Sequence, residues 1–441
     1  MRSNPMRWFK YTVISVGLLL LLALVVPLFI PLERFIPQLE KLATEKLGQP
    51  VQIESLHFTL LPAPALKLHG LRIGPDQQRF EAIILRPALG SLFQPVKVLR
   101  VVEVRGFRVT PQLLGLAGAL AKPQGEQAQI VQVQRIQLGG MHLALENLIW
   151  GPLRADIVLK AQAVQGIEAG SEDGKFKLRL TPGEKAQALQ IDAEQWQLPI
   201  KPALKFDQLT ARGDLGQNTL TLPDIQGQLY GGTLQGKASI DWIRDWRVKG
   251  DLKLHQVETK EIVALLTRTL GVSGKLHAQG GYSLRAKDPA QLAASLSGNF
   301  KFEVKQGVLY GFDLAQAVKT LAQSGTRGGQ TRFDALSGTL IITGKQYQLR
   351  DLYIASGVLT AQGDIKIAPN KQLSGTLLVA LKGIAGLVQV PLDVSGTLSD
   401  PILLPNRAAL AGAAAGTAIL GPGFGTGVGS KAGQMLDKLF K

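Results

Sequence analysis

Residues 333–367 read FDALSGTLIITGKQYQLRDLYIASGVLTAQGDIKI, and this stretch decides the fold class. Its apolar residues recur at every second position, and turn signals interrupt them roughly every eight to twelve residues. Alternation with a period of two places apolar side chains on one face of a strand and polar side chains on the other. The stretch therefore predicts short antiparallel β-strands joined by tight turns.

The composition extends this prediction to most of the chain. The 441 residues include 49 glycines, one per nine residues (441/49), which is close to the spacing of turns between short strands. Cysteine is absent, so disulfide bonds and thiolate sites are excluded. We therefore expect a mostly β protein with a few short helices.

The net charge of +16 raises the question of a nucleic-acid partner. The basic residues are spread along the strand-patterned segments, and no zinc-finger or helix-turn-helix spacing occurs. We therefore expect no nucleic-acid partner. Two explanations of the charge stay open. One is attraction to anionic lipid head groups, at about 1 kcal/mol per cation near the surface, and the other is a face that lysine keeps soluble.

An apolar segment near the N-terminus predicts a membrane anchor. Residues 11–32, YTVISVGLLLLLALVVPLFIPL, are uncharged, and as a helix they would extend about 33 Å, enough to cross the hydrocarbon core. Basic residues precede the run. This predicts a single pass through the inner membrane, with a cytoplasmic N-terminus and the bulk of the chain in the periplasm. The residues expected at the membrane interface are Arg7, Trp8, Phe9, Lys10 and Tyr11.

A cleaved signal peptide is the alternative for this segment, because a basic start followed by an apolar run is common to both. The run is long for a signal peptide, and bulky residues rather than an A-x-A site follow it. We therefore favour the uncleaved anchor.

The pattern divides the chain into five regions. Residues 1–32 form the N-terminus and anchor, 33–115 a short helix followed by strands, 116–129 a flexible loop, 130–405 a β-rich region, and 406–441 a Gly/Ala-rich tail.

Short helices are expected at four places among the strands. The first follows the anchor and ends at Gly48, and the others occupy residues 260–271, 288–296 and 313–325, the last of them capped by Asp313. We interpret the last three as covers or corners of a sheet.

The sequence offers only near misses to reactive sites. The glycine-rich residues 338–346 and 421–431 lack P-loop spacing. The five histidines lie far apart, and the nearest carboxylates to any of them, such as Glu258 beside His255, are in strand-patterned segments where helical spacing does not join side chains. We expect no enzyme, no catalytic residue, no cofactor and no metal site, although sites assembled by folding stay open.

Four strand motifs follow one another in a distinctive order. They are QPVQIESLHFTLLPAPALKLHGLRIG (49–74), directly after the anchor and short helix, then VKQGVLYGFDL (304–314), FDALSGTLIITG (333–344) and VSGTLSDP (394–401). They are patterned strands and not catalytic signatures, so their order and spacing carry the comparison. In this respect the chain resembles the AsmA-like family of bacterial envelope proteins.

The resemblance implies a protein anchored in the inner membrane whose elongated, antiparallel sheet curls lengthwise into an apolar groove. Relatives of this kind are linked to phospholipid movement between the inner and outer membranes and to outer-membrane homeostasis. The implied partners are phospholipid acyl chains and the inner membrane, with the outer membrane or its assembly proteins as further candidates.

An apolar strand face that lines such a groove would contact lipid. In three consecutive strands the candidate lipid-facing residues are Leu359, Ala361, Ile365, Ile367, Leu373, Leu377, Val379, Leu381, Val390, Leu392 and Val394. Alternation does not say what covers this face, and a sandwich or closed barrel would bury it. Two other functions stay open: an assembly factor that binds outer-membrane proteins by β-augmentation, and a structural tether without cargo.

Overall fold

The computed structural model forms two compact units, with unit 1 ending at Glu184 and unit 2 beginning at Lys185. The division falls within the stretch 130–405 that the sequence pattern treats as one region. The structure describes residues 32–406 except residues 62, 75–77, 92–93, 111–112, 114–130, 146–147, 162, 185, 200–202, 265–270, 321–324 and 383–388. The predicted anchor up to residue 31, the loop 116–129 and the tail from residue 407 lie outside the described residues.

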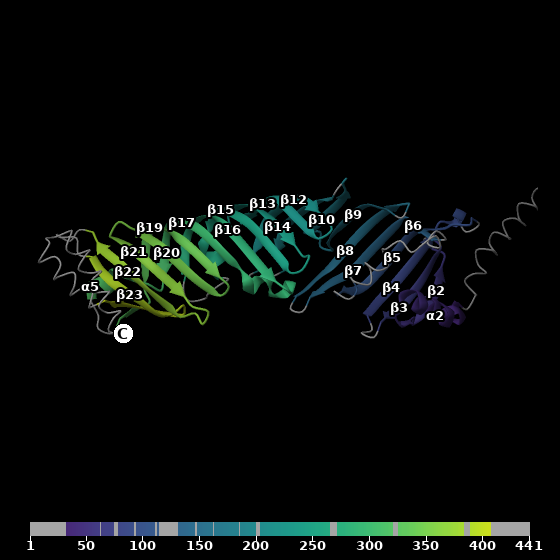
Figure 1. The fold of residues 1–441 in the computed structure, drawn as a ribbon, viewed down its shortest axis with the longest axis horizontal. Helices are drawn as coiled ribbons and strands as arrows, with labels where there is room; N and C mark the ends of the chain where they lie inside the picture. Colours follow the sequence, from purple (N-terminus) through teal and green to yellow (C-terminus); the bar gives the residue numbers. More distant parts are fainter. Residues whose placement is uncertain are drawn as a thin grey trace, which may run out of the picture. The chain divides into compact units, whose positions relative to one another are not determined.

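Unit 1 is a β-sheet with a helix packed beside its first strands (Figure 1). Its helices are η2 (Leu32–Phe35), α2 (Ile36–Leu47) and η3 (Leu89–Ser91). Its strands are β1 (Val51–Gln52), β2 (Ser55–Thr59), β3 (Ala65–Ile73), β4 (Gln78–Pro87), β5 (Lys97–Val109), β6 (Val131–Val133), β7 (Arg135–Leu145), β8 (Leu148–Lys160), β9 (Ala163–Ser171) and β10 (Phe176–Pro182). Both β1 and β2 pair with β3, and the sheet continues through β4 and β5 to β7, β8, β9 and β10.

Unit 1 departs from the fully antiparallel sheet that we predicted, because β5 runs parallel to both β6 and β7. Parallel neighbours need a crossover of about a dozen or more residues, and the connection between β5 and β6 supplies that length. Alternating side chains look the same in parallel and antiparallel strands. The sequence pattern therefore could not give the direction of this pair.

The core of unit 1 forms where α2 meets the sheet. Phe80 and Phe107 stack with their ring centroids 5.4 Å apart, and Val51 and Leu71 are buried beside them. Helix α2 ends at Gly48, whose left-handed backbone (φ +64°) lets its N–H donate to the carbonyl of the last turn. The predicted end of this helix is confirmed.

Unit 2 is an antiparallel meander in which each strand pairs with the next (Figure 1). Its strands are β11 (Gln187–Gln197), β12 (Lys205–Leu215), β13 (Thr219–Leu229), β14 (Gly232–Asp241), β15 (Trp246–Glu258), β16 (Gly271–Ala286), β17 (Ser297–Tyr310), β18 (Thr326–Arg327), β19 (Gln330–Thr343), β20 (Gln346–Ala355), β21 (Leu359–Ile367), β22 (Leu373–Leu381), β23 (Gln389–Thr397) and β24 (Asp400–Pro405). Helices α4 (Thr259–Ala264), η5 (Pro289–Ser295) and α5 (Leu314–Thr320) lie at the three predicted places, although η5 is a 3-10 helix.

The short strand β18 is the exception to this order. It follows β17 in the chain, and β17 pairs instead with β19, while β18 pairs with the last strand through Thr326 to Leu403 and Arg327 to Ile402. Gly325, at φ +76°, provides the left-handed turn that this path requires. Part of the edge of β24 is thereby covered, which reduces the unpaired backbone exposed at this end of the sheet.

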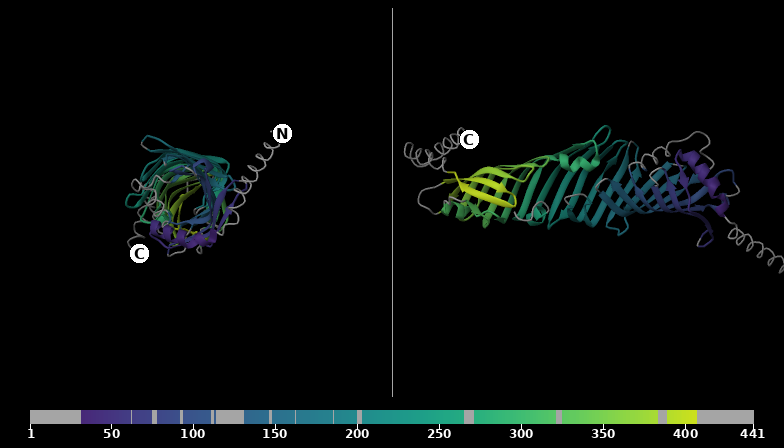
Figure 2. Two further views of the ribbon diagram at one scale, coloured as in Figure 1. Left: turned by 90° about the vertical axis from the view of Figure 1, so that its right-hand side faces the viewer. Right: turned by 90° about the horizontal axis from the view of Figure 1, so that it is seen from below.

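The sheet of unit 2 is curled (Figure 2). We attribute this curvature to glycines on the apolar face, where the neighbouring strands come close together. Gly280 in β16 lies between Leu252 in β15 and Phe300 in β17. A Cβ atom at Gly280 would come within 2.0 Å of the carbonyl oxygen of Asn299 in the neighbouring strand. Neighbouring strands therefore approach more closely on this face than a side chain would allow.

Gly280→Ala should lower the free energy of unfolding by about 1 to 3 kcal/mol, because the neighbouring backbone must move to admit the methyl group. Gly281→Ala is the matched control. Its methyl group would point to the other face and meet only the end of the Asp251 side chain, at 3.2 Å. Denaturant unfolding of both variants measures the difference, and equal losses would contradict this explanation of the curvature.

Candidate functional site

The apolar face of unit 2 carries one continuous row of directly paired residues. Each member is opposite the next in the neighbouring strand, from β11 to β23. We call this set the transverse row, and it consists of Ile191, Ala211, Ile225, Gly236, Leu252, Gly280, Phe300, Leu340, Leu349, Ile365, Gly375 and Val394. Ala211 and Val394 are buried and the other ten are half-buried. Protein atoms therefore cover most of the row only in part.

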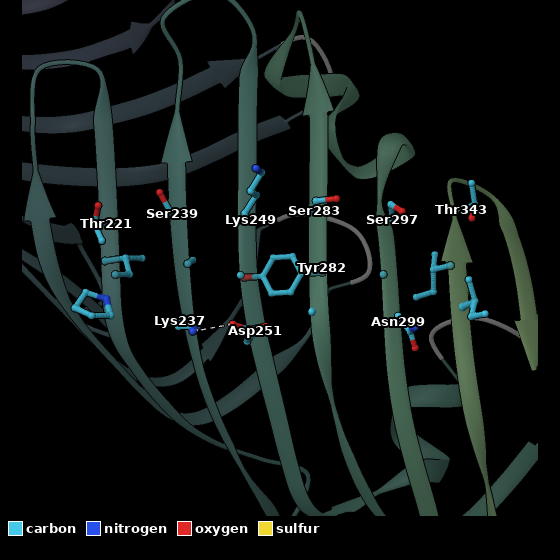
Figure 3. Close-up of a pocket in the computed structure, with 18 residues that line it drawn as sticks. Thr221, Lys237, Ser239, Lys249, Asp251, Tyr282, Ser283, Ser297, Asn299 and Thr343 are labelled. Carbon is cyan, nitrogen blue, oxygen red and sulfur yellow. Dashed lines mark ion pairs between the residues drawn. The ribbon is translucent and has the colours of Figure 1, made fainter.

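A cavity of about 760 Å³ lies beside the row (Figure 3). A second set of directly paired residues contributes to its lining: Leu222, Ala238, Gly250, Tyr282, Gly298 and Ile342. The Tyr282 ring lies against Gly250, where a Cβ atom would come within 2.6 Å of the tyrosine oxygen. The glycine therefore makes room for the ring. The volume falls within the range of about 300 to 1,000 Å³ that is common for ligand sites.

Polar residues alternate with these lining residues along the same strands (Figure 3), and their side chains extend from the opposite face of the sheet. Lys237 Nζ and Asp251 Oδ2 form an ion pair at 3.0 Å across β14 and β15, and both side chains are exposed. Lys249 adds a further exposed cation. Burial raises the pKa of the Tyr282 hydroxyl, and the charge of Asp251 raises it further, so this hydroxyl stays neutral at physiological pH.

The predicted lipid-facing residues lie in or beside a packed protein core. Nine of the eleven are buried, namely Leu359, Ala361, Leu373, Leu377, Val379, Leu381, Val390, Leu392 and Val394. Ile365 and Ile367 are half-buried and pack against this core, and Ile365 belongs to the transverse row. Protein atoms therefore cover the nine almost completely in the folded chain.

Helix α5 is the element that covers this part of the face. It contacts β19, β22, β23 and β24, and its residues Leu314 and Ala317 are almost completely buried among the nine. The predicted cap is confirmed, because Asp313 Oδ1 accepts a hydrogen bond of 2.8 Å from the Gln316 N–H. The sequence alone did not show which strands the helix would cover.

A buried threonine fixes the start of α5 to the sheet. Thr331 in β19 is 5% exposed. Its hydroxyl accepts a hydrogen bond of 3.0 Å from the Leu314 N–H and donates one of 2.8 Å to the Phe312 carbonyl. Both backbone groups would otherwise be buried without these partners.

Folding joins two histidines that sequence reasoning did not pair. A β-bulge between Leu254 and Val257 brings His255 beside His277, with their Nδ1 atoms 3.0 Å apart. No spacing signal could have revealed them, because their proximity depends on strand register. The weak candidate pair of His255 and Glu258 is not supported, since Glu258 pairs with Lys275 at 2.7 Å.

The surroundings of His277 favour its neutral imidazole. Burial lowers the pKa of His277, the nearby charges of His255 and Lys305 lower it further, and Glu303 opposes them. Within the described part of the chain, no group of three or more histidine, aspartate or glutamate side chains could hold a metal ion.

The expected membrane contacts cannot be placed. The interface residues from Arg7 to Tyr11 fall outside the described residues. Among the helices that the structure describes, none is both long enough and apolar enough to span a membrane.

Residues 183–345 match the model of the AsmA family. This stretch is therefore similar to the proteins of that family. We call it the AsmA region; it contains β11 to β19, most of the transverse row, and the motifs at residues 304–314 and 333–344. The match confirms the resemblance for these two motifs, whereas the motifs at residues 49–74 and 394–401 lie outside it. No curated protein and no solved structure matches the chain.

Thr331→Val should lower the free energy of unfolding by about 1 to 3 kcal/mol, because it leaves two buried backbone groups unsatisfied. Thr331→Ser retains the hydroxyl and should stay close to the wild type. Denaturant unfolding compares the two variants. Equal stability of the valine and serine variants would show that the hydroxyl does not hold α5.

The stability of unit 2 should fall as the pH decreases from about 8 to about 5. The folded-state pKa of His277 is lowered, so the unfolded chain binds more protons between the two pKa values and stability rises with pH there. His277→Gln should reduce this loss, and His142→Gln in unit 1 serves as the control. Unfolding midpoints at both pH values test this, and an unchanged pH dependence in His277→Gln would refute it.

Proposed function

We propose that this protein handles phospholipid in the bacterial envelope and holds acyl chains along the transverse row of unit 2. The row itself carries the proposal, because ten of its twelve positions are only half-buried although all are apolar or glycine. Contiguous apolar surface that protein does not fully cover is typical of a ligand groove or an interaction site. The match of the AsmA region to the family model supports the same class of function.

The chemistry of the row suits an acyl chain. Each CH₂ group that leaves water contributes about 0.8 kcal/mol, and this contribution requires no particular geometry. Leu252, Leu340 and Leu349 offer aliphatic contacts. The glycines of the row have no side chains, so they add no projecting groups that would block a ligand. A chain can therefore shift along the row without breaking hydrogen bonds. With strands about 4.8 Å apart, the row extends roughly 50 Å.

The cavity beside the row suits the junction between an acyl chain and its head group. Leu222 and Ile342 supply apolar wall, and the neutral Tyr282 hydroxyl supplies a hydrogen-bond donor on the same face. A tyrosine hydroxyl can donate to an ester or phosphate oxygen. We therefore place the head-group end of the lipid near Tyr282 and the acyl chain along the row.

Location in the envelope is part of the proposal. The uncharged run 11–32 and the basic residues before it support a single inner-membrane anchor, with the N-terminus in the cytoplasm and both units in the periplasm. Movement of lipid along the row requires no bond-breaking step in this chain. We accordingly propose a carrier and not an enzyme, with its direction set by partners or by the lipid gradient.

The alternative, an assembly factor for outer-membrane proteins, needs strand edges for β-augmentation. At the end of unit 2, β18 already pairs with two residues of β24. This contact disfavours the alternative at that edge. Crosslinking in cells separates the two functions, since the assembly factor predicts trapped outer-membrane polypeptides and the carrier predicts trapped lipid.

Leu340→Asp should abolish most lipid recovery while the protein stays folded, because the charge lies on the half-buried row and repels the acyl chain. Leu392→Asp should instead destabilise the protein by on the order of 3 to 5 kcal/mol, because Leu392 is fully buried and the charge would have no partner. Mass spectrometry of organic extracts and denaturant unfolding provide the two measurements.

Thr339→Asp is the matched control, since Thr339 precedes Leu340 in β19 and pairs with Lys301 and Arg350 on the other face. It should keep full lipid recovery. The proposal fails if the wild-type protein yields no phospholipid, or if Leu340→Asp folds and retains as much lipid as Thr339→Asp.

A further inference from the structure

Helix α2 of unit 1 has two apolar faces, and the fold uses only one of them. Ile36, Ala43 and Leu47 pack against the core of unit 1. A second stripe stays exposed. It consists of Phe35, the last residue of η2 and the N-cap of α2, and of Leu39 and Leu42 in α2, at 41%, 37% and 59% exposure. Their spacing of four and then three residues places them along one line of the helix.

The orientation of this stripe is fixed by hydrogen bonds between α2 and the first strand segment. Glu40 accepts a bond of 2.7 Å from the Ile53 N–H, and Thr44 accepts one of 3.1 Å from the Val51 N–H. The two bonds hold one side of α2 against the sheet. The exposed stripe is therefore a presented surface and not the result of a frayed helix.

The position of α2 in the chain indicates what covers the stripe. The uncharged run ends at Leu32, and only two residues separate it from Phe35. At no more than about 3.6 Å per residue, Phe35 lies within roughly 11 Å of the end of that run. Leu42 lies about 10 Å further along the helix. A bilayer that holds the run is thus within reach of the whole stripe.

Two further residues add to this surface. Lys46 is exposed and follows Leu42 by four residues, so it continues the stripe with a cation on a long apolar stem. Leu61, at 86% exposure, comes two residues after the end of β2, the strand that η2 contacts. Large apolar groups next to a snorkelling cation are typical of helices that lie in a membrane interface.

We propose that Phe35, Leu39 and Leu42 insert into the interfacial layer of the membrane that holds the N-terminal anchor, with Lys46 at the head-group phosphates. This contact rests on the anchor in the proposed function and goes beyond it. It fixes α2, and with it the first strands of unit 1, flat against the bilayer surface. A single flexible tether would leave that orientation free.

The chain contains no cysteine, so a single introduced cysteine gives a unique labelling site. Leu42→Cys probes the stripe, and Glu45→Cys, exposed on the same helix, is the matched control. Each full-length variant carries a nitroxide label in vesicles of phosphatidylethanolamine and phosphatidylglycerol. Accessibility to oxygen and to a water-soluble nickel complex reports the environment of the label. The oxygen-to-nickel ratio should be several-fold higher at position 42 than at position 45.

Equal ratios at the two positions would overturn the inference. Spin–spin broadening at position 42 would also overturn it, because it would show a second copy covering the stripe. These failures leave the anchor and lipid recovery intact, and so differ from failure of the proposed function. A chain that does not remain with the vesicles overturns both the anchor and this contact.

A second variant tests the contact without a label. Leu39→Ser with Leu42→Ser should expose α2 to a periplasmic protease several-fold faster in membranes, whereas Leu89→Ser, an exposed leucine elsewhere in unit 1, should not. An unchanged rate in the double variant would contradict the membrane contact.

Discussion

Strand register is the constraint on which unit 2 depends. Every strand presents one apolar face, and a slip of one residue would turn its apolar side chains to the opposite side of the sheet. The pairing from Ile191 to Val394 keeps all twelve members of the transverse row on one side. The sheet therefore acquires a single apolar surface that crosses twelve strands, and the curvature, the core and the candidate site all derive from that surface.

What covers each part of this surface determines its role. Near one end, Ile262 of α4 packs with Phe206, Leu229 and Val257. At the other, α5 contacts β22 and β23 and shares a buried cluster with residues of β21 to β23. Between these helices the row stays half-buried and the cavity adjoins it. One pattern of side chains thus forms a protein core where a helix covers it and an accessible apolar surface where none of the described helices does. The sheet therefore has a packed end next to the stretch for which we propose lipid binding.

Much of the architecture could be predicted from local pattern. Alternation indicated the strands, Asp313 and Gly48 marked helix ends, and the motifs at residues 304–314 and 333–344 indicated the family that the match confirms. The prediction of a fully antiparallel sheet was wrong for β5 and β7, which pair in parallel, because alternation is the same for both strand directions. The pairing of His255 with His277 was missed, since it depends on a bulge and on register between strands.

The sequence by itself determined which side chains share a face, because the strand period of two is a local property of the backbone. By the alternation pattern alone, Leu359 and Leu340 are both apolar residues on the same face of the sheet and cannot be distinguished. Only the tertiary structure decided that Leu359 is fully buried and Leu340 half-buried. Leu359 belongs to the core cluster that includes Leu314 and Ala317 of α5, whereas Leu340 lies outside that cluster. Burial is set by contacts between segments distant in sequence, and these contacts leave no periodic signal.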